Sequence, residues 1–207
     1  MEAIINAARR GDNELLQRSG MSSVTSARDF KRMTPLMHAA SAGHVSTVEL
    51  LLDAGADMNR AKTSDGTCPV HIAAQQGHEG VVSSLIFKGH VDVNRLKNDG
   101  TSALIISASC GHRSAVQYLL AGKADVDHAR DGGSTALLLA ARNGHFGAAR
   151  ALLNQDADVN LVKNDGTGPL YAAAANGHSV IVARLIKEGA DVNAVRVDGT
   201  TVSSAFV

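Results

Sequence analysis

Residues 34–59 read TPLMHAASAGHVSTVELLLDAGADMN, and a closely similar pattern returns four more times along the chain. A Gly-His pair marks every copy, and the pairs stand at Gly43-His44, Gly77-His78, Gly111-His112, Gly144-His145 and Gly177-His178. Successive pairs are 34, 34, 33 and 33 residues apart. So regular a period predicts a stack of similar units in place of one globular core.

Each copy predicts two short helices joined by a tight turn and followed by an extended loop. A hydroxyl residue before proline or alanine, as in Thr34-Pro35, suits a helix start because the hydroxyl accepts a hydrogen bond from a free backbone N–H of the first turn. The glycine of the Gly-His pair suits the left-handed conformation that ends many helices. Apolar residues at Val48, Leu51 and Leu52 then have helical spacing. Helices this short are marginal alone, so neighbouring copies must stack to bury them.

The pattern T-P-L, two alanines, Gly-His and then Gly-Ala-Asp followed shortly by asparagine resembles the ankyrin repeat. The resemblance covers nearly the whole chain and recurs in five copies. It implies an all-α repeat solenoid, a curved stack of helix-turn-helix units from which β-hairpin or loop fingers project along one edge. It also implies that the chain binds another protein, because that is the usual activity of ankyrin repeats.

We expect a single ankyrin repeat domain over residues 1–207, with atypical ends. Its expected parts are an N-terminal cap at 1–28, repeats at about 29–61, 62–96, 97–129, 130–162 and 163–195, and a partial repeat at 196–207. A terminal repeat normally needs a polar outer face. We therefore expect either that the natural protein continues beyond Val207 or that something packs on this end.

The composition narrows the class of partner. Of the 207 residues, 44% are hydrophobic and only 3% aromatic, so the core must be built from small aliphatic side chains. The formal net charge is zero, which argues against a nucleic-acid or membrane-surface binder that acts through the whole molecule. No apolar run approaches the roughly 20 residues of a membrane span. Two cysteines are too few for a disulfide framework, so we expect the reducing cytoplasm, with the nucleus as the alternative.

The recurring histidines invite a metal or catalytic interpretation, and their spacing argues against it. Neighbours one repeat apart would be separated by about one layer of packed helices, roughly 10 Å, whereas zinc ligands lie about 2.0–2.1 Å from the metal. We therefore expect each ring to bond backbone and to link adjacent loops. No nucleophile arrangement and no phosphate-binding glycine loop can be assembled. The sequence predicts no catalytic residue, no metal site, no cofactor and no small-molecule substrate.

The fingers carry a column of basic residues, three positions past the loop asparagine or aspartate of each copy. They are Lys62, Lys97, Arg130, Lys163 and Arg196. Acidic residues follow nearby, at Asp65, Asp99, Asp131, Asp165 and Asp198. One interpretation is a ladder of exposed ion pairs between adjacent fingers, each worth about 0–1 kcal/mol. The other is an electrostatic strip that meets an acidic segment of a partner protein.

The two residues before each repeat glycine vary while their neighbours stay constant. In ankyrin proteins these positions line the concave groove. The candidate partner-binding residues of the groove are Arg9, Arg10, Gln75, Gln76, Cys110, Arg142, Asn143 and Asn176. Arg142 is the best single candidate, with Arg9 and Arg10 next, because arginine is common at the strongest points of protein interfaces.

Two interpretations of function remain. The first is a non-catalytic protein–protein interaction module, an adaptor or scaffold, which binds its partner through the groove and the finger tips. The alternative is a regulatory or targeting ankyrin domain of a larger enzyme or multidomain protein whose remainder lies beyond Val207. The loop asparagines Asn59, Asn94, Asn160 and Asn193 also resemble hydroxylation sites of this family, and the competing interpretation is a loop-stabilising role.

Overall fold

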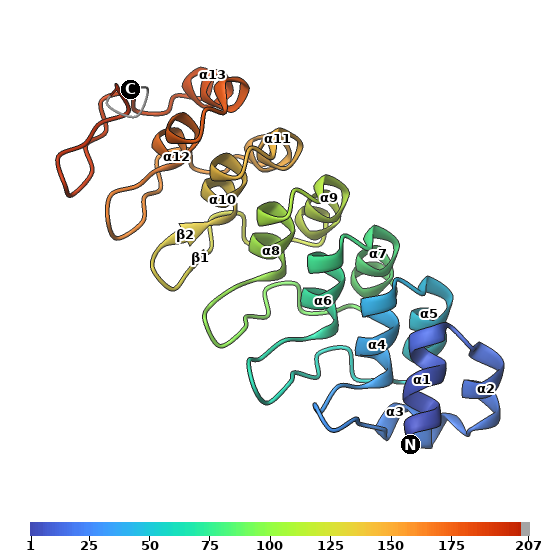
Figure 1. Cartoon of the computed structure of the whole chain (residues 1–207). Coiled ribbons are helices and arrows are strands. Elements are labelled where there is room, and N and C mark those ends of the chain that lie inside the picture. Colours follow the sequence, from blue (N-terminus) through green and yellow to red (C-terminus); the bar gives the residue numbers. More distant parts are fainter. Residues whose placement is uncertain (204–207) are drawn as a thin grey trace.

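The computed structural model of the chain describes residues 1–203 as an elongated, curved stack of paired helices, with the fingers along one edge (Figure 1). The inner row, next to the fingers, holds α1 (Glu2–Arg10), α4 (Pro35–Ala42), α6 (Pro69–Gln76), α8 (Ala103–Ser109), α10 (Ala136–Arg142) and α12 (Pro169–Ala175). The outer row holds α2 (Asn13–Arg18), α5 (Val45–Asp53), α7 (Glu79–Phe87), α9 (Arg113–Ala121), α11 (Phe146–Leu153) and α13 (Ser179–Lys187). Each helix packs on its neighbours in the same row.

The inner helices begin and end at the residues that the repeat pattern predicts. Thr34, Ser102 and Thr135 each accept a hydrogen bond from the backbone N–H three residues later, at 3.1–3.3 Å. Gly168 takes the same position before α12 and has no side chain to make that bond. A glycine with φ between 72° and 78° follows every inner helix, and these glycines are Gly11, Gly43, Gly77, Gly111, Gly144 and Gly177.

The core is built from two kinds of position that recur once per repeat. Each inner helix places a small residue against its neighbours, and the series Ala39, Ala73, Ser107, Ala140 and Ala173 is fully buried. Each outer helix contributes one fully buried leucine, and these are Leu16, Leu51, Leu85, Leu119, Leu152 and Leu185. Burying a leucine contributes roughly 1.5–3 kcal/mol. The leucines therefore supply a stabilising contact in every layer, while the small residues let the inner helices approach closely.

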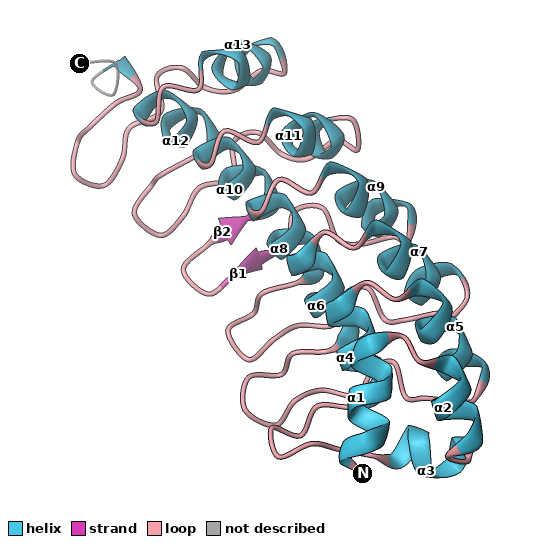
Figure 2. Cartoon of the chain, turned by 45° about the vertical axis from the view of Figure 1, so that its right-hand side comes forward, coloured by secondary structure: helices cyan, strands magenta, loops and turns pink. Residues whose placement is uncertain are grey.

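The fingers are loops and one short hairpin, all on the same side of the stack (Figure 2). In the hairpin, β1 (Ala129–Arg130) pairs antiparallel with β2 (Ser134–Thr135). Isolated bridges at Leu96–Ser102 and Val195–Thr201 repeat this pairing in two other fingers. Neighbouring fingers are bonded through backbone groups, for example Asp131 N–H to Asp99 O at 3.2 Å. The expectation of projecting β-hairpin or loop fingers is confirmed.

The loop asparagines bond neighbouring repeats to each other. Each side-chain oxygen accepts a backbone N–H from the next repeat, and the bonds join Asn59 to Asp92, Asn94 to Asp125 and Asn160 to Asp191 at 2.8–3.1 Å. These contacts account for Asn59, Asn94 and Asn160 as loop-stabilising residues.

The N-terminal segment contains a helix that the sequence did not predict. α3 (Met21–Ser26) follows α2 and packs on α2 and α4, with Val24 fully buried. At the opposite end, residues 204–207 of the expected partial repeat lie outside the described residues. Between residues 1 and 203, no helix combines the length and the apolar character that a membrane crossing requires.

Candidate functional site

Each histidine of the Gly-His pairs bonds the repeat before it. The ring Nε2 lies 3.0–3.1 Å from a backbone carbonyl oxygen of that repeat, and these oxygens belong to Arg9, Ser41, Gln75, Ser109 and Arg142. Because a carbonyl only accepts, the ring Nε2 carries the proton and donates. The expected role of these histidines as links between adjacent repeats is confirmed.

The glycine of each joint is required by space as well as by backbone conformation. A Cβ on Gly77 would lie 2.6 Å from the Nδ1 of His112, and a Cβ on Gly111 would lie 2.6 Å from the Nδ1 of His145. Gly177 has a similar φ of 73°, but nothing lies within 4 Å of its Cβ position. The ring of one repeat therefore packs directly over the glycine of the repeat before it.

The predicted groove residues end the inner helices or directly follow them, and all eight are exposed. Two of them also make bonds within the fold, Asn143 to the previous repeat and Asn176 to its own helix. The side-chain amide of Asn143 donates to Ser109 O at 2.8 Å, and that of Asn176 donates to Ala172 O at 2.8 Å. The other predicted groove side chains, Arg9, Arg10, Gln75, Gln76, Cys110 and Arg142, stay exposed at the surface.

The basic residues of the fingers do not form a uniform ladder. Arg196 bonds Asp198 in its own finger at 2.7 Å and lies 3.7 Å from Asp165 of the previous finger. Lys163 also pairs with Asp165, at 3.2 Å. Within residues 1–203, the remaining basic residues of the column, Lys62, Lys97 and Arg130, have no carboxylate within 4.0 Å. The ladder interpretation therefore holds only at the C-terminal end of the column.

The finger aspartates organise the turn of their own finger. Asp165 accepts the backbone N–H of Thr167 at 2.9 Å, and Asp198 accepts that of Thr200 at 3.0 Å. The Thr167 backbone bond is the main reason that the pKa of Asp165 lies well below its usual range. Asp131 stands one place earlier in its finger than these aspartates, and Gly132 takes the equivalent place. The third finger, which holds Arg130, consequently lacks the carboxylate that pairs with Lys163 in the fourth finger and with Arg196 in the fifth.

Five of the predicted residues meet in one hollow of about 240 Å³ between the inner helices and the fingers, which we name the central hollow. It is lined by Gln75, Lys97, Asp99, Thr101, Ile105, Ile106, Ser109, Cys110, Arg130, Leu139 and Arg142. Lys97, Arg130 and Arg142 outnumber the single carboxylate of Asp99, which leaves a formal surplus of two positive charges. The predicted residues outside this hollow are Arg9, Arg10, Gln76, Asn143, Asn176, Lys62, Lys163 and Arg196.

Two buried polar atoms of the central hollow have no hydrogen-bond partner, the Nε of Arg130 and the Oγ1 of Thr101. Thr101 is 5% exposed. Partial burial raises the pKa of Asp99, but the nearby hydroxyl and backbone N–H of Thr101, together with the charge of Lys97, leave that pKa below its usual value. Only the backbone N–H of Thr101 makes a well-formed bond to Asp99, at 3.1 Å. The Thr101 hydroxyl is close enough to lower the pKa of the Asp99 carboxyl, but it makes no hydrogen bond of acceptable geometry.

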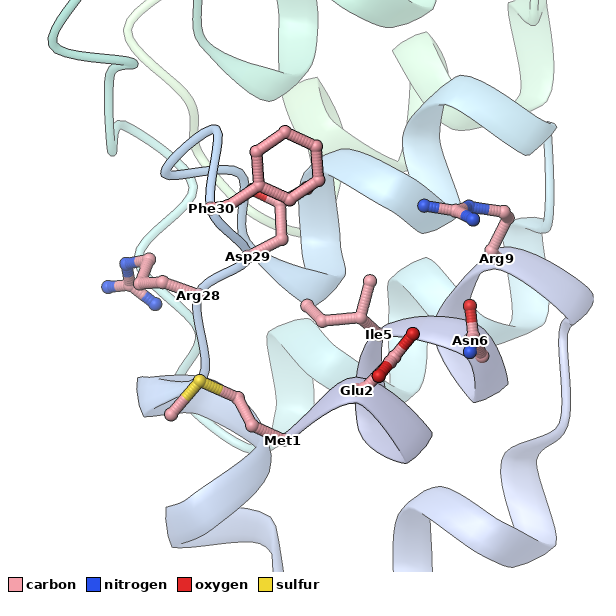
Figure 3. Close-up of a pocket in the computed structure, with 8 residues that line it drawn as sticks. All are labelled: Met1, Glu2, Ile5, Asn6, Arg9, Arg28, Asp29 and Phe30. Atoms are coloured by element: carbon pink, nitrogen blue, oxygen red, sulfur yellow. The ribbon is translucent and has the colours of Figure 1, made fainter.

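A second hollow of about 430 Å³, the N-terminal hollow, lies between α1 and residues 28–30 (Figure 3). Its lining includes Arg9, and Phe30 at its edge is 91% exposed. Asp29 is already used by the fold, because it accepts from His38 Nε2 at 3.0 Å and from two backbone N–H groups. Sequence reasoning missed this hollow, because the sequence shows that Phe30 is one of only four phenylalanines but not that its ring is exposed.

A family model described as ankyrin repeats (3 copies) matches the chain over residues 4–96, 54–130, 84–163 and 122–196. The overlapping matches cover residues 4–196. The chain belongs to the ankyrin repeat family. Ankyrin repeats are in general protein–protein interaction modules, and their domains are typically non-catalytic. A comparison with curated proteins gives no match.

In this ankyrin stack the constant and the variable residues have separate roles. Constant residues of the repeat, such as Gly111 and His112, bond one layer to the next. Variable residues, such as Gln75 and Arg142, keep exposed side chains on a backbone whose carbonyl is held by the next repeat. Within residues 1–203, no group of three His, Cys, Asp or Glu side chains gathers where it could hold a metal ion.

Proposed function

We propose that this ankyrin repeat chain is a non-catalytic adaptor or scaffold, a single domain that binds a partner protein across its concave groove and finger tips. One observation carries the proposal. In each of five joints, the histidine of one repeat bonds the backbone carbonyl of a groove position in the previous repeat. The groove side chains are then free for recognition while their backbone is fixed.

A fixed backbone favours binding because less conformational freedom is lost when the partner arrives. Arg9, Gln75 and Arg142 occupy equivalent positions and are exposed. Arginine side chains are common at the residues that contribute most to binding free energy. The free cysteines Cys68 and Cys110 favour a reducing compartment, and we place the module in the cytoplasm.

A second candidate is a regulatory or targeting domain within a larger protein. The last repeat favours it, because Val195 is 61% exposed, Val197 is 81% exposed and Ile186 on α13 is 47% exposed. Exposed apolar side chains on the last repeat, two on its finger and one on its outer helix, are suited to contact with further protein.

The test is affinity capture from native lysate followed by mass spectrometry, with three baits. They are the unchanged chain, the groove variant Arg142→Glu and the control Arg113→Glu on outer helix α9, where Arg113 is exposed. We expect the unchanged chain and the control to capture the same partners, and we expect the groove variant to lose them. Circular dichroism confirms that all three are folded. Equal retention by all three baits would show that the groove does not bind the partner.

A further inference from the structure

We propose that the central hollow binds the carboxylate of a glutamate or aspartate from an extended segment of the partner protein. This inference rests on the proposed protein-binding function and names the chemistry that one part of the surface recognises. The hollow presents Lys97, Arg130 and Arg142, of which none has a carboxylate within 4.0 Å among residues 1–203.

The fifth finger shows the bonds that the equivalent arginine makes when a carboxylate is present. Arg196 donates from Nη1 to Asp198 at 2.7 Å and from Nε to the Thr167 hydroxyl at 3.0 Å. Its donors on both sides of the guanidinium are thereby satisfied. The pair Arg196 and Asp198 is therefore an example, within this chain, of the contact that we infer for Arg130 in the third finger.

The third finger holds the equivalent arginine, Arg130, without these partners. Gly132 replaces the aspartate, and nothing lies within 4 Å of a Cβ placed on it. The Nε of Arg130 and the hydroxyl of Thr101, which correspond to the bonded pair Arg196 and Thr167, are both buried and unpartnered. Buried donors without acceptors are unfavourable. A carboxylate from outside that takes the place Asp198 has on Arg196 can accept from the guanidinium of Arg130, in the two-point geometry that arginine offers to carboxylates.

The walls of the hollow favour a peptide side chain over a nucleic acid. Ile105, Ile106 and Leu139 lie beside the charged groups, and the partly exposed Ile106 offers an apolar contact to the methylene stem of an acidic side chain. No aromatic side chain lines the hollow, whereas single-stranded nucleic acids are usually held by stacking on aromatic rings. Gln75 and Arg142 continue from the hollow into the groove, which fits an extended segment passing over it.

The test uses ¹⁵N-labelled protein and three capped peptides, in which glutamate, glutamine or phosphoserine alternates with glycine. At low salt we expect the glutamate peptide to shift the Arg130 Nε–H signal and the glutamine peptide to leave it unchanged. Arg130→Gln should weaken binding of the glutamate peptide by about tenfold, the loss of one charge-assisted contact. The control Arg113→Gln on the outer face should bind normally.

A matched pair of variants tests the missing carboxylate directly. Gly132→Asp restores an internal partner for Arg130 and should abolish binding of the glutamate peptide. Gly132→Asn introduces a side chain of the same shape without the charge, so this variant should retain binding. Asparagine and aspartate both tolerate a left-handed backbone better than most residues. Equal loss in the two variants would overturn the proposal.

The remaining outcomes also separate the two proposals. An unmoved Arg130 signal, equal binding of the glutamine peptide, or binding of the phosphoserine peptide alone would overturn the carboxylate assignment. If lysate partners are lost with Arg142→Glu but retained with Arg130→Gln, the groove function stands and the inference about the hollow fails. If neither substitution affects capture while the glutamate peptide still binds, the proposed function fails and the hollow remains a carboxylate site.

Discussion

The packing of His145 over Gly111 makes a quantitative prediction about the joints. In Gly111→Ala, the new Cβ enters a left-handed backbone and lies 2.6 Å from the ring Nδ1 of His145. The backbone conformation alone costs about 1–2 kcal/mol for alanine. The ring must also move, which breaks its 3.0 Å bond to Ser109 O and costs about 1 kcal/mol more. We expect Gly111→Ala to lower the free energy of unfolding by about 2–3 kcal/mol.

Gly177→Ala is the matched control, because it has the same backbone strain with nothing within 4 Å of the new Cβ. It should cost only the conformational part, about 1–2 kcal/mol. A double-mutant cycle that combines Gly111→Ala with His145→Ala provides an internal check. Once the ring is absent, Gly111→Ala should cost no more than Gly177→Ala does.

Urea unfolding followed by far-ultraviolet circular dichroism measures these values, and the slope of the transition shows whether each variant unfolds in the same way. A coupling of about 1 kcal/mol between positions 111 and 145 is the expected result. If the cycle shows no coupling and both glycine variants cost the same, the ring does not hold the two repeats together and the explanation of the Gly-His pair is wrong.

Three further predictions concern the stability of single repeats. Gly168→Ser restores a hydroxyl at the start of α12, where a Cβ has room. Urea unfolding should show a free energy of unfolding about 0.5–1 kcal/mol higher, whereas a lower value would mean that the cap does not form. Leu119→Ala removes a fully buried side chain and should cost about 2–5 kcal/mol without altering glutamate-peptide affinity in the remaining folded protein. Burial lowers the pKa of His71 from 6.5 to about 4, so the unfolded chain takes up a proton first. Stability should fall by roughly 3 kcal/mol between pH 6.5 and pH 4, and a His71→Asn variant measured over the same range should lose less.

The repeat period was sufficient to predict the solenoid, because each physical requirement of the fold leaves a residue at a fixed place. The helix ends depend on hydroxyl residues and on glycines, and the link between layers depends on a histidine beside the glycine. By contrast, α3 was not predicted, since Met21–Ser26 is rich in serine and threonine, which favour helices weakly. It forms because burial of Val24 against the stack outweighs that weak preference.

The candidate site was predicted in outline and not in detail. Sequence reasoning selected Gln75, Lys97, Cys110, Arg130 and Arg142, and the structure brings these five together in one hollow. It treated all the finger charges as one column, however, because neighbouring acids were counted without their register. The aspartate of this finger stands at Asp131 and not at the place of Gly132, and Arg130 therefore has no ion pair of the kind that Arg196 makes with Asp198. The effect depends on the direction of side chains, which a list of charges does not contain.

The Gly-His joints also determine how the surface can vary. The two longer spacings of 34 residues change loop lengths, yet the carbonyls of Arg9, Ser41 and Gln75 that accept from the next repeat all stand two residues before their glycines. Groove positions therefore advance by one layer per repeat regardless of loop length. A substitution such as Gln75→Arg should change the local contact without altering the interval to the next position. A partner must match that interval. Single groove substitutions can then change specificity one position at a time, whereas a broken joint would displace every groove position beyond it.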